Sequence, residues 1–85
     1  MITNKKIALA LAILELSIEI TNKSDVDIFC DFSSHVNSFT VRIALNGWNS
    51  ESYETDYYKT MYLDWNCEEE LQKTLDYIKM IKENI

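Results

Sequence analysis

Residues 26–46, VDIFCDFSSHVNSFTVRIALN, decide the fold of this chain, because they hold two stretches in which apolar residues recur at every second position. The first stretch covers 26–32. The second covers 38–46 and places Phe39, Val41, Ile43 and Leu45 on one face. Such alternation puts successive side chains on opposite faces of a strand, and β-branched and aromatic residues favour that conformation. Since only 33–37 separate the two stretches, we predict a β-hairpin whose loop lies at these residues.

A third alternating stretch, 58–65, follows a longer connection that opens with the turn signal Asn46-Gly47. It places Met61, Leu63 and Trp65 on one face and Tyr58, Thr60 and Tyr62 on the other. We therefore predict three strands in sequence.

The stretch before the hairpin, 4–21, is predicted to be a helix with Thr3 or Asn4 as its cap. At 100° per residue its apolar side chains form two stripes on opposite sides. One stripe holds Leu9, Ile13, Leu16 and Ile20, and the other holds Ile7, Leu11, Leu14 and Ile18. Residues 14–20 also alternate as a strand would, but the alanines and leucines before them favour a helix.

The last stretch is predicted to form a second helix capped by Asn66, with Glu69 in the capping-box position. Its apolar stripe holds Leu71, Leu75, Ile78 and Ile85, with Met80 or Ile81 between them. The element order is therefore αβββα. We predict one α+β domain over 1–85: a three-stranded antiparallel meander with both helices on one face.

The chain has a formal net charge of -6, and most of it lies in the second part of the sequence. Residues 1–50 hold five acids and four bases, whereas residues 51–85 hold nine acids and four bases. This field repels phosphate backbones and anionic lipid. We therefore expect no direct nucleic-acid binding and no membrane binding.

Cys30 and Cys67 are too few for a disulfide scaffold, so we expect reduced thiols and a cytoplasmic location. The apolar run at 7–14 is far shorter than the roughly 20 residues that cross a bilayer. It ends at Glu15 without a small-x-small cleavage site, so no signal peptide is predicted.

No catalytic site, metal site or cofactor is predicted, and we do not expect an enzyme. His35 is the only histidine and falls in the hairpin loop, and with Cys30 and Cys67 it lacks the paired spacing of a zinc site. The aspartates at 25, 27 and 31 lack the glycine and closing glutamate of a calcium loop. One glycine is too few for a phosphate-binding loop.

Two surfaces are candidates for contact with another protein. The first is the connection 47–57, which combines the aromatics Trp48, Tyr53 and Tyr57 with the acids Glu51, Glu54 and Asp56. The alternative for this connection is a structural lid in which Trp48 folds back on the sheet edge. The second is the sheet face turned away from the helices, which would hold Phe29, Thr40, Arg42, Ala44, Tyr58, Thr60 and Tyr62.

The two stripes of the first helix also predict self-association, because a helix that is apolar on two sides must be covered on two sides. Ile7, Leu11, Leu14 and Ile18 are the candidate residues for a homodimer contact. The alternative is that the second helix covers the second apolar stripe within one chain.

Residues 29–48, FCDFSSHVNSFTVRIALNGW, resemble small uncharacterised prophage-encoded proteins of Gram-positive bacteria, chiefly in the His-Val-Asn turn and the Asn-Gly-Trp ending. The resemblance implies a phage accessory protein in the cytoplasm of a bacterial host. It carries over no site residues.

Two functions therefore stand as hypotheses. The first is a non-enzymatic accessory protein that acts through protein–protein interaction, as a homodimer and with an unidentified protein partner. The second is an acidic nucleic-acid mimic that inhibits a host defence or DNA-binding protein. The mimic needs Glu51, Glu54 and Asp56 to continue the line of Glu68, Glu69 and Glu70, which requires the connection to lie beside the start of the second helix.

Overall fold

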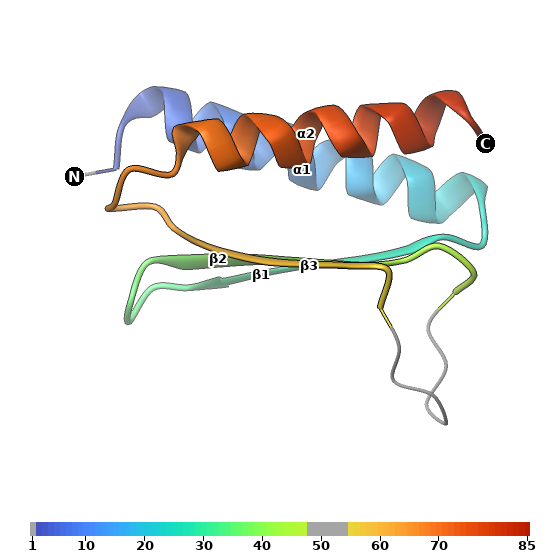
Figure 1. The fold of residues 1–85 in the computed structure, drawn as a ribbon, viewed down its shortest axis with the longest axis horizontal. Helices are drawn as coiled ribbons and strands as arrows, with labels where there is room; N and C mark the ends of the chain where they lie inside the picture. The colour runs from blue at the N-terminus through green and yellow to red at the C-terminus, as the bar shows by residue number, and fades with distance from the viewer. Residues whose placement is uncertain (1, 48–54) are drawn as a thin grey trace.

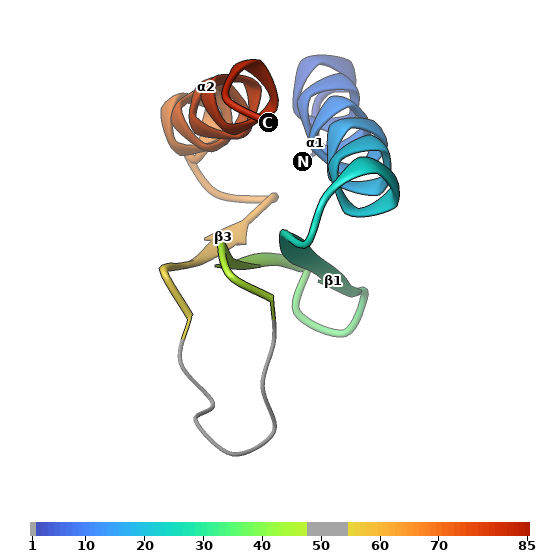
Figure 2. The ribbon, with the colours of Figure 1, turned by 90° about the vertical axis from the view of Figure 1, so that its right-hand side faces the viewer.

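The computed structural model describes residues 2–47 and 55–85. The elements are α1 (Asn4–Lys23), β1 (Asp27–Ser33), β2 (Ser38–Ala44), β3 (Tyr57–Tyr62) and α2 (Glu68–Glu83). The strands form one antiparallel sheet in the order β1-β2-β3. Both helices lie on the same face of this sheet (Figure 1), which confirms the predicted αβββα fold. Viewed along the strands, α1 lies on the β1 side and α2 on the β3 side (Figure 2).

Helix α1 is continuous through the stretch whose alternation resembled a strand. Thr3 is its N-cap, and the Thr3 hydroxyl accepts a hydrogen bond from the Lys6 backbone N–H at 3.2 Å. This cap satisfies one of the N–H groups that have no partner inside a helix. Leu9, Ile13 and Ile20 are buried, so one of the two predicted stripes forms the core side of α1.

The core lies between the helices and the facing side of the sheet. Strand β2 is central and supplies three buried side chains, Phe39, Val41 and Ile43. The hairpin between β1 and β2 turns at 34–37, within the predicted loop 33–37, because Ser33 belongs to β1 and pairs with Ser38; Asn37 in this turn has a φ of 55°. Asparagine tolerates this left-handed conformation better than most residues.

Strands β2 and β3 end earlier than the alternation predicts. Strand β2 stops at Ala44, so Leu45 lies outside it and is exposed. Strand β3 stops at Tyr62, and Trp65 lies in the following turn with 73% of its surface exposed. Ala44 was expected on the open face of the sheet, but it is buried.

The predicted cap of α2 is wrong by one residue. Cys67 is the N-cap, without a side-chain hydrogen bond, and it is buried in the core cluster. The turn that positions it is closed by backbone bonds from Trp65 N–H to the Tyr62 carbonyl and from Cys67 N–H to the Trp65 carbonyl. Packing of Cys67 therefore overrides the capping preference of Asn66. The three glutamates at 68–70 still lie in the first turn, where the helix dipole favours acids.

The buried stripe of α2 consists of Leu71, Thr74, Leu75, Ile78 and Ile81. Met80 and Ile85 are exposed. Of the two residues predicted as alternatives for this stripe, Met80 and Ile81, it is Ile81 that lies in the core. Ile85 lies beyond the last residue of the helix, Glu83, so the helical period no longer directs it inward.

Candidate protein-binding face

The second stripe of α1 is open to solvent. Ile7, Leu11, Leu14 and Ile18 are exposed by 45%, 60%, 40% and 63%. We call these four residues the α1 face. Scattered apolar residues on a surface are ordinary, but four in register along one helix form a continuous apolar strip, which marks a contact surface.

The α1 face points away from α2. The opposite side of α1 is joined to α2 by two ion pairs, Lys5 with Glu68 at 2.9 Å and Glu19 with Lys82 at 2.7 Å. The hydrogen bond and charge of Lys82 lower the pKa of the Glu19 carboxyl. Because these pairs lie near the two ends of α1, they hold α2 along the other side of the helix and leave the α1 face uncovered.

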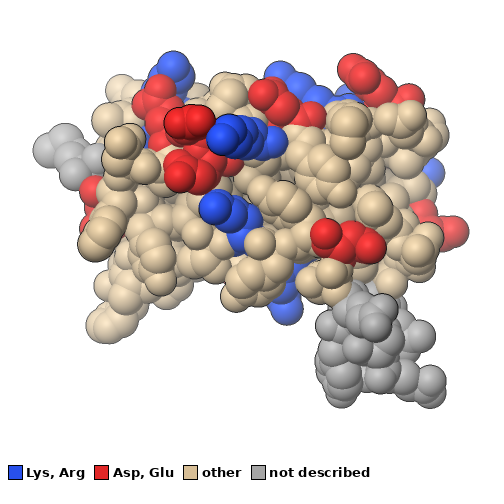
Figure 3. Space-filling model, viewed as in Figure 1, with Lys and Arg blue, Asp and Glu red and all other residues tan. Residues whose placement is uncertain are grey.

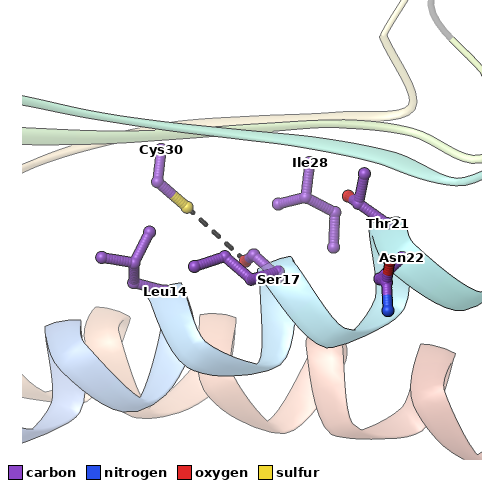
Figure 4. Close-up of a pocket in the computed structure, with 7 residues that line it drawn as sticks. Leu14, Ser17, Thr21, Asn22, Ile28 and Cys30 are labelled. Atoms are coloured by element: carbon purple, nitrogen blue, oxygen red, sulfur yellow. Dashed lines mark hydrogen bonds between the residues drawn. The ribbon is translucent and has the colours of Figure 1, made fainter.

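A groove continues the α1 face toward the sheet. Its volume is about 410 Å³, and Leu14, Ser17, Ile18, Thr21 and Asn22 of α1 line it together with Ile28 and Cys30 of β1. Figure 4 shows Ile28 and Cys30 pointing from the strand toward the helix. Both are only half-buried although they lie on the helix side of the sheet. Helix α1 therefore leaves part of the β1 edge open, and none of these lining residues is charged.

The cysteine in this groove is not set up as a nucleophile. The Cys30 thiol donates a long hydrogen bond to the Ser17 hydroxyl, 3.5 Å between Sγ and Oγ, and Ser17 in turn donates to the Ile13 carbonyl at 2.6 Å. Burial raises the pKa of the Cys30 thiol, an effect that the Ser17 bond opposes and Asp31 reinforces. Since the thiolate is the reactive form, a protonated thiol is a weak nucleophile.

The other candidates for chemistry are placed as follows. Cys67 is buried, and burial raises the pKa of its thiol. His35 is exposed in the hairpin turn. Over 2–47 and 55–85, no group of three or more His, Cys, Asp and Glu side chains is arranged to hold a metal ion. No catalytic constellation emerges from these described residues.

The open sheet face carries a row of three candidate residues in register. Phe29 pairs with Arg42, and Arg42 pairs with Tyr58. The Arg42 guanidinium lies 5.1 Å from the centre of the Phe29 ring and 3.4 Å from the Asp31 carboxylate. Tyr62 is exposed but lies four residues further along β3, where it contacts Trp65 at 6.3 Å between rings.

The threonines of β2 and β3 separate Tyr62 from that row. Thr40 and Thr60 are partners across the strands and share a hydrogen bond at 3.0 Å. The aromatic residues of this face therefore do not form one continuous apolar patch, unlike the residues of the α1 face.

Most of the candidate recognition loop lies outside the described residues, namely Trp48, Glu51, Tyr53 and Glu54. Tyr57 is described, and it belongs to β3 rather than to the loop. Its hydroxyl hydrogen-bonds with Thr74 at 2.7 Å, and its ring lies 5.1 Å from that of Tyr77. Tyr57 thus faces the core and joins the sheet to α2.

Of the three loop acids that the nucleic-acid mimic needs, only Asp56 is described, and it does not lie beside the start of α2. Asp56 comes just before β3, and Glu68 follows the opposite end of that strand. The Asp56 carboxylate accepts the Leu45 backbone N–H at 2.7 Å. Glu68 is paired with Lys5, and Glu69 with Lys73. On the α2 side, acids and lysines are interspersed (Figure 3) rather than drawn out in one line.

Comparison of the chain with models of known protein families, with curated proteins and with solved structures finds no match. The described residues contain no helix of sufficient length and apolar character to cross a membrane.

Proposed function

We propose that this protein is a non-enzymatic accessory protein that acts through protein–protein interaction, with the α1 face as a contact surface, and that it self-associates as a homodimer. The observation that carries the proposal is the exposed strip Ile7, Leu11, Leu14 and Ile18, continued by the groove beside β1. Burying apolar surface is the main favourable contribution to protein association. We place its action in the cytoplasm of a bacterial host, as a phage product, on the resemblance of residues 29–48.

The α1 face supports protein binding better than the open sheet face does. The four side chains of the α1 face are contiguous. On the open sheet face, the Thr40–Thr60 pair separates the aromatic side chains, and the Arg42–Asp31 ion pair adds charge. A contact surface needs an apolar centre with few charges. Glu15 is the charged residue of α1 closest in sequence to the centre of the strip, and it is exposed.

Site-specific photo-cross-linking tests the proposal. Leu11 is replaced by the photo-reactive residue p-benzoylphenylalanine, and the protein is produced in bacterial cells and irradiated. Asp76, an exposed residue of α2, and Tyr58, on the open sheet face, carry the same replacement in two matched controls. We expect protein adducts from the Leu11 position and none from Asp76.

The mass of the adduct identifies the partner. An adduct of twice the chain mass supports the homodimer, and one of another mass supports a foreign protein. Adducts that form from Tyr58 and not from Leu11 would move the binding surface to the sheet and refute the proposal.

A further inference from the structure

We infer that the α1 face is closed by the α1 face of a second copy, with the two helices antiparallel about a two-fold axis. This inference rests on the proposed function and names the partner and its orientation. The residues of the face are separated by four, three and four positions, which is the a/d spacing of a coiled-coil seam. A seam of this kind is self-complementary, as an interface between two identical copies must be.

The antiparallel arrangement matches side chains layer by layer. When the helices cross midway between Leu11 and Leu14, Leu11 meets Leu14 of the second copy and Ile7 meets its Ile18. At the two ends of the strip, the polar Asn4 meets Thr21 of the second copy. Apolar side chains thus face apolar ones, and polar side chains face polar ones.

Charge supports the same orientation. In this register Glu15 lies on the same flank of the seam as Ala8 of the second copy, whose side chain is uncharged. Each positive helix N-terminus also lies beside the negative C-terminus of the other helix. A parallel pair would instead place both N-termini and both Lys5 side chains at the same end.

The groove accepts a side chain of the second copy. Leu14, Ser17, Ile18 and Thr21 line it and occupy positions i, i+3, i+4 and i+7 of α1, which is the set that forms a hole in knobs-into-holes packing. Because Ile7 of the second copy faces Ile18, it is the side chain that enters this hole. Ile28 and Cys30 of β1 line the same groove on its sheet side (Figure 4).

The position of the α1 face sets the shape of the pair. Helix α1 lies on the β1 side of the molecule (Figure 2), and its ion pairs to α2 come from the side of the helix opposite the α1 face. Pairing therefore extends the helix layer to the order α2-α1-α1-α2 and keeps both sheets below it. The open faces of the two sheets then point in the same direction.

Disulfide trapping tests the orientation. Asn4→Cys and Thr21→Cys are made as two separate chains in a Cys30→Ser background, because Cys30 lies in the same groove as Thr21. Cys67 stays in place because it is buried. On mild oxidation we expect a disulfide dimer from the mixture of the two chains and not from either chain alone. Lys73→Cys, exposed on α2, is the control that should remain uncross-linked.

The antiparallel orientation would be overturned if each variant formed disulfide dimers with itself and the two variants formed none with each other. A wild-type chain that remains monomeric while its Leu11 position cross-links a foreign protein would overturn the second copy as partner and leave the proposed function standing.

A second measurement compares the native chain with Leu11→Glu, so that it does not depend on the folding of the cysteine variants. Alkylation of Cys30 by iodoacetamide should slow as protein concentration rises, since the second copy covers the groove, and it should not slow for Leu11→Glu. A rate at Cys30 that is independent of concentration in both proteins would overturn the inference.

Discussion

Lys6 is the buried charged residue that joins the start of α1 to the turn between β3 and α2. It is 8% exposed, and its ammonium donates to the Leu63 carbonyl at 3.1 Å and to the Trp65 carbonyl at 2.6 Å. A buried charge is costly unless it is hydrogen-bonded, and here backbone carbonyls provide those bonds. Lys5 and Lys6 are adjacent, and nothing in the sequence indicates that Lys6 is buried while Lys5 is exposed.

Replacing Lys6 with methionine keeps an apolar side chain of similar length and leaves the two carbonyls without this donor. We expect the free energy of unfolding to fall by about 1–3 kcal/mol, as for the loss of charged hydrogen bonds at buried carbonyls. Lys5→Met is the matched control, and its exposed ion pair with Glu68 should be worth less than about 1 kcal/mol. Urea unfolding measures the free energy of unfolding of both variants, and an equal loss in the two would contradict this role of Lys6.

Cys30 makes stability depend on pH at the alkaline end. Burial raises the pKa of this thiol in the folded state, so folding disfavours the thiolate. The stability that Cys30 contributes is therefore fully present below the unfolded thiol pKa, about 8.5, and is lost as the pH rises toward the folded pKa. Between pH 7 and pH 10 the unfolding free energy of the native chain should fall more than that of Cys30→Ser. Parallel curves for the two proteins would exclude this role for Cys30.

At the scale of the elements, sequence periodicity predicted the type and order of all five. The long apolar run of α1 and its cap Thr3 outweighed the strand-like alternation of 14–20. Element ends were predicted less well, because tertiary contacts fix them. The backbone bonds of the 62–67 turn place Cys67 in the core and move the start of α2 past Asn66.

The candidate site was only partly visible in the sequence. Both stripes of α1 are equally apolar, so the pattern revealed a doubly apolar helix but not which stripe α2 and the sheet would cover. The groove was not predicted, since it depends on how far α1 lies over β1. Tyr57 shows how a boundary shift alters a role: β3 begins at Tyr57 rather than Tyr58, and this residue becomes an inward-facing strand residue.

The two sides of α1 should respond oppositely to the same substitution. Leu11 is 60% exposed, and Ile13 is completely buried. Ile13→Glu places an unpaired charge in the core and should unfold the chain, because such a charge costs several kcal/mol. Leu11→Glu should keep the fold. Far-ultraviolet circular dichroism with thermal melting distinguishes the two, and loss of the helical signal in Leu11→Glu would show that this side of α1 is needed for folding.

At the scale of the whole molecule, we predict a dimer built by one helix of each copy. The rest of the surface carries net negative charge and would keep two copies apart, and this repulsion weakens as salt rises. Since the contact itself is apolar, salt should strengthen the pair. This dependence is the opposite of that expected for an acidic mimic bound to a basic protein.

Sedimentation equilibrium at micromolar concentration tests the central claim, that the α1 face pairs two copies of the chain. We expect a mass of twice 10.0 kDa for the native chain and 10.0 kDa for folded Leu11→Glu. Tyr58→Ala, on the open sheet face, should remain dimeric and serves as the control. A native chain that sediments as a 10.0 kDa monomer across the whole concentration range, or a Leu11→Glu chain that stays dimeric, would contradict the claim.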